Sequence, residues 1–79
     1  MENCLGIVRD VGFGMRDGNQ PILWFTAETL DVSLFLIFNL ENAGRVIKEA
    51  GVYDIKNLEG KSCIMECEGT YPVRFLRWR

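Results

Sequence analysis

Hydrophobic and polar positions along this chain follow two periods, that of a strand and that of a helix. Residues 4–11 and 22–27 are rich in apolar, β-branched and aromatic side chains, and they predict two strands joined by the glycine-rich segment 12–21. Residues 32–38, "VSLFLIF", have Ser33 as their only polar member. They predict a third strand at the middle of the sheet, buried on both sides.

The period changes to that of a helix after residue 38. Asn39 is a good N-cap, and Gly51 stands where a left-handed C-terminal cap is expected. Apolar residues recur between them at the spacing that forms one helical stripe: Ala43, Val46, Ile47 and Ala50. The sequence therefore predicts a helix over residues 40–50.

The remainder of the chain returns to strands. Asp54 can cap a single helical turn that Gly60 ends. In residues 61–68, three side chains are predicted to face the core: Cys63, Met65 and Cys67. Pro72 marks residues 71–78 as an edge strand. The fold class is α+β, with a small five-stranded, mostly antiparallel sheet, open or curled like a barrel, and one helix packed on it in the order βββαββ.

Composition limits what such a protein can be. With 79 residues, of which 48% are hydrophobic, the chain predicts a single domain over 1–79 that is either a monomer or a homodimer. Its net charge of -2 argues against a domain that mainly neutralises phosphates. No apolar run approaches the roughly 20 residues of a membrane span, and the N-terminus does not resemble a signal peptide. A cytoplasmic location, with no membrane partner, is expected.

Little in the sequence indicates catalysis. The chain has no histidine, and its serines lack a neighbouring base. Gly60, Lys61 and Ser62 resemble a phosphate loop, but Ile55 stands where that loop needs glycine. Cys63 and Cys67, about 13 Å apart on one strand, can neither bond to each other nor share a zinc ion. We expect reduced cysteines, no catalytic residues, no metal and no cofactor, and hence a protein that is not an enzyme.

Two groups of residues are candidates for binding. The first group combines apolar side chains in a loop with two pairs of carboxylates that suit a protein partner with a basic surface: Asp10, Phe13, Met15, Asp17, Glu66 and Glu68. The C-terminal "YPVRFLRWR" interleaves arginine with aromatic residues, as single-stranded nucleic-acid surfaces do: Tyr71, Arg74, Arg77, Trp78 and Arg79. That stretch can equally be a protein contact, or an edge strand with its aromatics in the core and arginines guarding the edge.

Residues 45–65, "RVIKEAGVYDIKNLEGKSCIM", resemble small proteins encoded by bacteriophages and prophages. In those proteins a helix leads through a glycine and valine to a capped turn, a glycine-lysine pair and a strand. The residues that match in register are Ala50, Gly51, Val52, Leu58, Gly60, Lys61, Cys63 and Met65. Ile55 and Asn57 stand where the family often has tryptophan and aspartate.

The resemblance implies an accessory protein of a phage or mobile element that acts by binding. Members of this class include proteins that block bacterial defences. The sequence thus predicts a protein that occludes a host protein or ribonucleoprotein, such as a CRISPR-type complex, in the cytoplasm of the host cell. The alternative is a barrel-like protein that binds single-stranded nucleic acid through its C-terminal strand.

Overall fold

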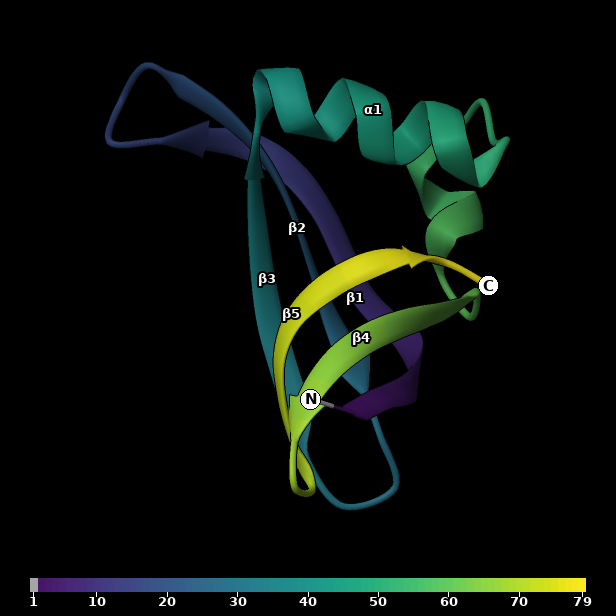
Figure 1. The fold of residues 1–79 in the computed structure, drawn as a ribbon. Coiled ribbons are helices and arrows are strands. Elements are labelled where there is room, and N and C mark those ends of the chain that lie inside the picture. Colours follow the sequence, from purple (N-terminus) through teal and green to yellow (C-terminus); the bar gives the residue numbers. More distant parts are fainter. Residues whose placement is uncertain (1) are drawn as a thin grey trace.

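A curled antiparallel sheet with one helix lying across its concave side is the framework of the molecule (Figure 1). The computed structural model describes residues 2–79. In chain order the elements are β1 (Glu2–Arg16), β2 (Gln20–Glu28), β3 (Ser33–Asn39), α1 (Leu40–Ala50), the 3-10 helix η1 (Ile55–Leu58), β4 (Ser62–Glu68) and β5 (Tyr71–Trp78). The strands lie in the order β3-β2-β1-β4-β5, and every neighbouring pair is antiparallel. The expected five-stranded sheet with one helix is confirmed, and its curl makes a half-barrel.

β1 is the central strand. Its first residues pair with β4, from Glu2 opposite Cys67 onward, and its last residues pair with β2 as far as Arg16 opposite Gln20. Ile7 is the residue at which the two pairings meet. The 15-residue β1 therefore joins the β2–β3 hairpin on one side of the sheet to the β4–β5 hairpin on the other.

The prediction that residues 32–38 form the middle of the sheet is wrong. β3 lies at one edge, and its side chains alternate between half-buried and exposed. Phe35 is 58% exposed and Ile37 is 42% exposed. An apolar run can be buried on both sides, or it can have one covered face and one bare apolar face, and hydropathy does not distinguish these cases.

A bulge in β1 explains a second difference from the prediction. The pairing skips from Arg9 opposite Thr26 to Gly12 opposite Trp24, so Asp10 and Val11 are both inserted opposite one residue of β2. The strand then continues to Arg16 through the glycines that were expected in a loop. The extra residue reverses the alternation of side chains, which places Gly12 and Gly14 on the convex face of the sheet.

The helix is where the sequence predicts it. The side chain of Asn39 accepts a hydrogen bond from the Asn42 amide at 2.9 Å, and Gly51 adopts the left-handed conformation at φ 73°. Ala43 and Val46 are buried against the sheet. The short helical turn is also confirmed, since Asp54 caps it and Leu58 is fully buried.

The core fills the concave side of the half-barrel beneath α1. Its fully buried side chains include Val8, Leu23, Phe25, Leu58 and Met65. Aromatic rings from the two edge strands meet over this core, because Phe38 on β3 and Phe75 on β5 have ring centroids 5.8 Å apart. Edge-to-face contacts of this kind add to the apolar burial, and they hold the edges of the sheet toward each other.

The expectation of three reduced cysteines is wrong for two of them. Cys4 on β1 and Cys67 on β4 form a disulfide, with Cα atoms 6.0 Å apart. Cys67 lies diagonally across from Cys4, because its direct partner is Glu2. Two cysteines four positions apart on one strand are too distant to bond, whereas pairing of β1 with β4 brings Cys4 within reach of Cys67. Cys63 is free and buried.

Candidate binding surfaces

The residues predicted for a protein partner lie in two separate places. Phe13, Met15 and Asp17 belong to the hairpin between β1 and β2, whereas Glu66 and Glu68 lie near the end of β4. Glu66 pairs with Asn3 of β1. Asn3 and Phe13 are ten positions apart on β1, which corresponds to roughly 30 Å of strand. One contact surface centred on either group does not include the other.

The carboxylates of these residues also differ in their ion-pair partners. Arg74 on β5 donates from Nε to Oε1 of Glu66 at 2.7 Å, so this carboxylate has a partner within the sheet. Asp17 lies 3.8 Å from Arg16 at the hairpin turn and is largely exposed. Asp10 takes a left-handed conformation, φ 57°, at the bulge. Its position is thus tied to the geometry of β1.

The C-terminal strand separates Trp78 from its exposed basic residues. Trp78 is half-buried among the core rings, and its Nε1 donates to the carbonyl oxygen of Val46 at 2.9 Å. Arg77 and Arg79 are exposed, as is Tyr71. Because Trp78 is bound on the inner side, Tyr71 is the one aromatic ring of the predicted nucleic-acid surface that is exposed and could stack on a base.

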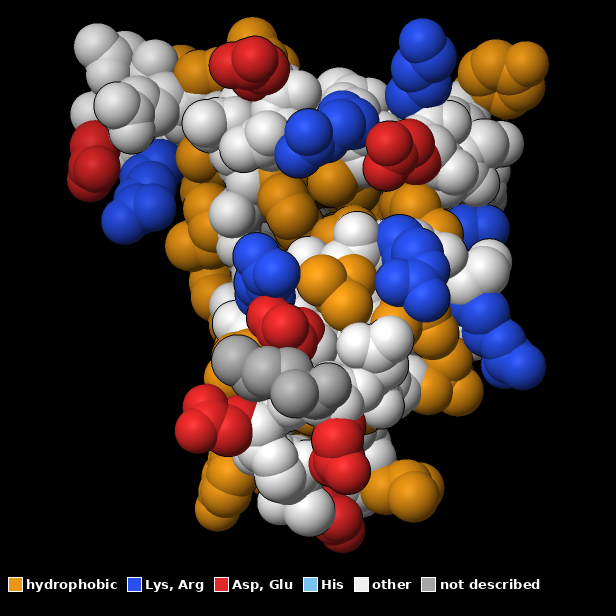
Figure 2. All heavy atoms as spheres, in the orientation of Figure 1, with side chains coloured by type: hydrophobic (Ala, Val, Ile, Leu, Met, Phe, Trp, Pro, Cys, Tyr) orange, Lys and Arg blue, Asp and Glu red, His pale blue; other side chains and the backbone are white. Residues whose placement is uncertain are grey.

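The convex side of β2 and β3 carries an apolar surface that the sequence did not reveal. We call it the β2–β3 face, and it consists of Ile22, Trp24, Phe35 and Ile37. In the register of the two strands Trp24 is opposite Ile37, and Phe35, two positions before Ile37, is opposite Thr26. Figure 2 shows hydrophobic side chains running down the edge of the molecule on the side of these strands.

No element within residues 2–79 covers the β2–β3 face. The helix packs on the opposite side, where Ala43 and Val46 join Leu23 and Phe25 in the core. Trp24 itself is half-buried because its indole ring lies over Gly12 and Gly14 of β1. The result is a bare, ordered, apolar sheet face in a small domain.

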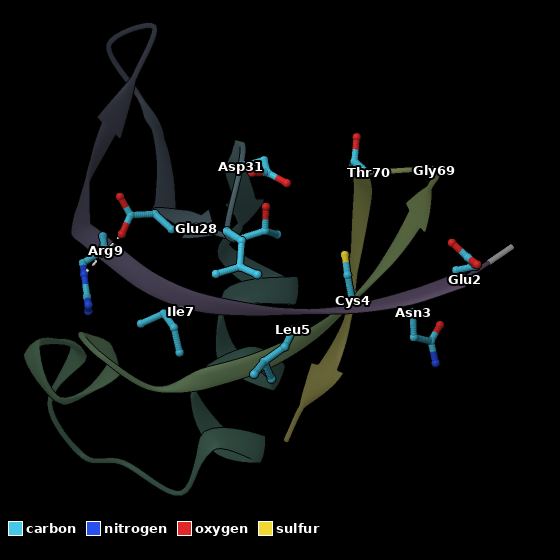
Figure 3. A pocket seen from close by; sticks show the side chains of 12 residues that line it. Glu2, Asn3, Cys4, Leu5, Ile7, Arg9, Glu28, Asp31, Gly69 and Thr70 are labelled. Atoms are coloured by element: carbon cyan, nitrogen blue, oxygen red, sulfur yellow. Dashed lines mark ion pairs between the residues drawn. The ribbon is translucent and has the colours of Figure 1, made fainter.

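A pocket of about 650 Å³ lies beside the first residues of β1 (Figure 3). The turn between β2 and β3 and the turn between β4 and β5 form its other sides, and Asp31 and Thr70 come from these turns. Glu2 lies at one end, and Arg9 with Glu28 at the other, where Arg9 Nε is 3.4 Å from Glu28 Oε1. The pocket is thus lined by β1 and rimmed mainly by carboxylates.

The cysteines offer no reactive centre at this pocket. Cys4 lines it but is bonded to Cys67. Burial raises the pKa of the Cys63 thiol to about 11, and a hydrogen bond with the backbone of Gly6 only partly opposes this. Cys63 is therefore a neutral thiol at physiological pH. Across the described part of the chain, no three histidine, cysteine or acidic side chains are placed to hold a metal ion.

Comparison of the chain with protein families, with curated proteins and with solved structures finds no match. Neither helix within residues 2–79 has the length and apolar character needed to cross a membrane.

Proposed function

We propose that this protein works by binding another protein, and that the β2–β3 face is its principal contact surface. The observation that supports this most is the exposure of Phe35 and Ile37 beside Trp24 on a sheet face that nothing in residues 2–79 covers. Contiguous exposed apolar side chains on a small domain are typical of protein contacts. Aromatic residues such as Phe35 and Trp24 are also enriched at the centre of such interfaces.

The rigidity of the face favours this function over a chance exposure. β3 pairs with β2 along its whole length, from Ser33 opposite Glu28 to Asn39 opposite Ile22. The side chains of the face are therefore held in a fixed pattern before a partner arrives. A preordered surface loses less conformational entropy on binding than a mobile loop does.

Binding of single-stranded nucleic acid has weaker support. Trp78 is engaged in the core and Arg74 is paired with Glu66, which leaves Tyr71 with Arg77 and Arg79 as the exposed part of that surface. A stacking platform needs aromatic rings that are free on the outside. Titration with a single-stranded oligonucleotide at low salt is the control for this alternative.

The experiment compares capture of proteins from a bacterial lysate by the wild type and by a Phe35→Thr/Ile37→Thr double variant. Threonine is β-branched, which suits an edge strand, and it removes the exposed apolar surface. A Tyr53→Thr variant is the matched control, because Tyr53 is fully exposed and lies between α1 and η1, away from the face. A protein that the wild type and the control retain, and the double variant loses, supports the proposal. Equal capture by all three contradicts it.

The more specific form of this proposal is occlusion of a bacterial defence complex. It is based on the resemblance of residues 45–65 to phage and prophage proteins. Expression of the wild type should then restore plating of a phage that a CRISPR-type system targets. The double variant should not restore plating. Failure of the wild type to restore plating against every system tried would contradict occlusion of a defence complex. Protein binding itself is tested separately by the capture experiment.

A further inference from the structure

The first residues of β1 have an unpaired backbone edge. The amide of Val8 donates to the carbonyl oxygen of Lys61 at 2.9 Å, and the amide of Gly60 donates to the carbonyl oxygen of Val8 at 2.8 Å. The peptide groups of Val8 thus face the β4 side. Because successive residues of a strand direct these groups to alternate edges, those of Asn3, Leu5 and Ile7 face the β2 side.

β2 ends before it reaches Asn3 and Leu5. Its last pair with β1 is Glu28 opposite Ile7, and the chain then turns into β3 through hydrogen bonds between Thr29 and Val32. Among residues 2–79 no strand lies against Asn3 or Leu5 on this side. Two amides and two carbonyl groups are therefore available to pair with another chain.

This open edge coincides with the 650 Å³ pocket. Figure 3 shows Cys4 on one side of β1, with Leu5 and Ile7 on the other side. A groove that runs along a strand edge is lined by side chains from both faces of that strand, because side chains alternate. The volume falls within the range of pockets that take small ligands or short peptide segments.

We propose that the open edge of β1 at Asn3 and Leu5 binds an extended, lysine- or arginine-containing segment of another protein as an added β-strand. The segment occupies the place that β2 would take if it continued past Glu28. Strand addition of this kind gains affinity from main-chain hydrogen bonds and specificity from the side chains beside the edge. Unpaired strand edges are in general templates for such pairing.

The charges around the pocket select the chemistry of the segment. Glu2 and Asp31 are exposed carboxylates at its rim, whereas Glu28 is already paired with Arg9. A basic side chain in the added strand finds complementary charge at this rim, and an acidic one is repelled. Leu5 and the fully exposed Leu30 provide apolar contacts for the neighbouring positions.

Two synthetic octapeptides test this proposal by NMR on isotopically labelled protein. One has the sequence TVKVTVKT, and its twin TVEVTVET replaces the lysines by glutamates. At roughly millimolar peptide, the lysine peptide should shift the amide signals of Asn3 and Leu5, and the glutamate twin should bind more weakly. Absence of shifts at these amides, or equal binding of both peptides, overturns the proposal.

Variants separate the backbone contribution from the charge. Leu5→Pro removes the amide that faces the pocket and leaves the pairing with β4, so affinity should fall about five-fold or more. Leu5→Ala keeps that amide and controls for the lost side chain. Leu5→Pro binding as well as Leu5→Ala overturns strand addition.

Asp31→Lys tests the proposal even if Leu5→Pro does not fold. Asp31 lies in an exposed turn, so this substitution should not disturb folding. It should weaken the lysine peptide about two- to five-fold and strengthen the glutamate twin. Glu49→Lys makes the same charge change on α1, away from the pocket, and should leave both affinities unchanged. Equal effects of the two charge changes contradict the proposal. The Phe35→Thr/Ile37→Thr variant should bind the peptide like the wild type, so this site and the β2–β3 face are tested separately.

Discussion

Trp24 on β2 lies directly against the backbone of Gly12, its partner on β1. A Cβ atom built on Gly12 would be 2.5 Å from the indole nitrogen of Trp24, which is closer than real Cβ contacts. The ring extends to Gly14, where a Cβ would be 3.3 Å from Cη2. Glycine is therefore required at position 12 by close approach of the ring, and this packing fixes one side of the β2–β3 face.

Replacing Gly12 by alanine should destabilise the protein. The added methyl group displaces the indole ring, and overpacking of this kind costs about 1–3 kcal/mol. Gly44→Ala is the matched control, because Gly44 lies inside α1 with open space around it, and alanine there should raise the stability by about 0.5–1 kcal/mol. Urea denaturation measures both changes. A Gly12→Ala variant as stable as the wild type contradicts the packing.

The left-handed backbone of Asp10 at the bulge should make stability depend on which residue replaces it. Its φ of 57° is left-handed, a conformation that aspartate tolerates and β-branched residues avoid. Asp10→Val should lower the free energy of unfolding by about 1–2 kcal/mol, whereas Asp10→Gly should be neutral or stabilising. Thermal denaturation compares the two variants. If valine is tolerated as well as glycine, the bulge does not have this geometry.

Local signals explain which parts of the fold the sequence predicts well. Asn39 and Gly51 delimit α1 through hydrogen bonds and backbone angles within a few residues of themselves, so the helix is confirmed at both ends. The inward face of β4 follows from strict alternation, and Cys63, Met65 and Cys67 are all buried there. Such features do not depend on which strand lies beside which.

The features that the sequence missed all depend on pairing between distant segments. The position of β3 at an edge, the bulge that reverses β1 and the Cys4–Cys67 disulfide follow from the strand order β3-β2-β1-β4-β5. Both candidate sites arise in the same way. The β2–β3 face is bare because no element packs on it within residues 2–79, and the open edge exists because β2 stops at Glu28.

The disulfide between Cys4 and Cys67 should contribute substantially to stability. It joins residues 63 positions apart, and closing a loop of that length restricts the unfolded chain. We expect reduction of the oxidised protein, or the Cys4→Ser/Cys67→Ser substitution, to lower the free energy of unfolding by about 2–4 kcal/mol. Urea denaturation with and without reductant provides the measurement. The double variant should not respond to reductant, and three free thiols in the oxidised wild type would rule the bond out.

The raised pKa of the Cys63 thiol should make the stability of the protein depend on pH. Its pKa is raised from an ordinary value of 9.0 to about 11 by burial, so between these values the unfolded thiol loses its proton while the folded one keeps it. The unfolded state then binds fewer protons, and stability falls as pH rises from 9 toward 11. A Cys63→Ala variant lacks this contribution, so the advantage of the wild type over it should shrink across this window. A constant difference in their urea midpoints would mean that the thiol titrates normally.

A photo-reactive phenylalanine analogue at position 35 tests most directly whether the β2–β3 face contacts a protein. Phe35 is the most exposed side chain of this face, and Tyr53, which is fully exposed, provides a control position away from it. Illumination in a bacterial lysate should join position 35, and not position 53, to one protein of defined mass, and the Ile37→Thr substitution should reduce the yield. Equal products from both positions, products only with nucleic acid, or no product at position 35 would contradict protein binding through this face.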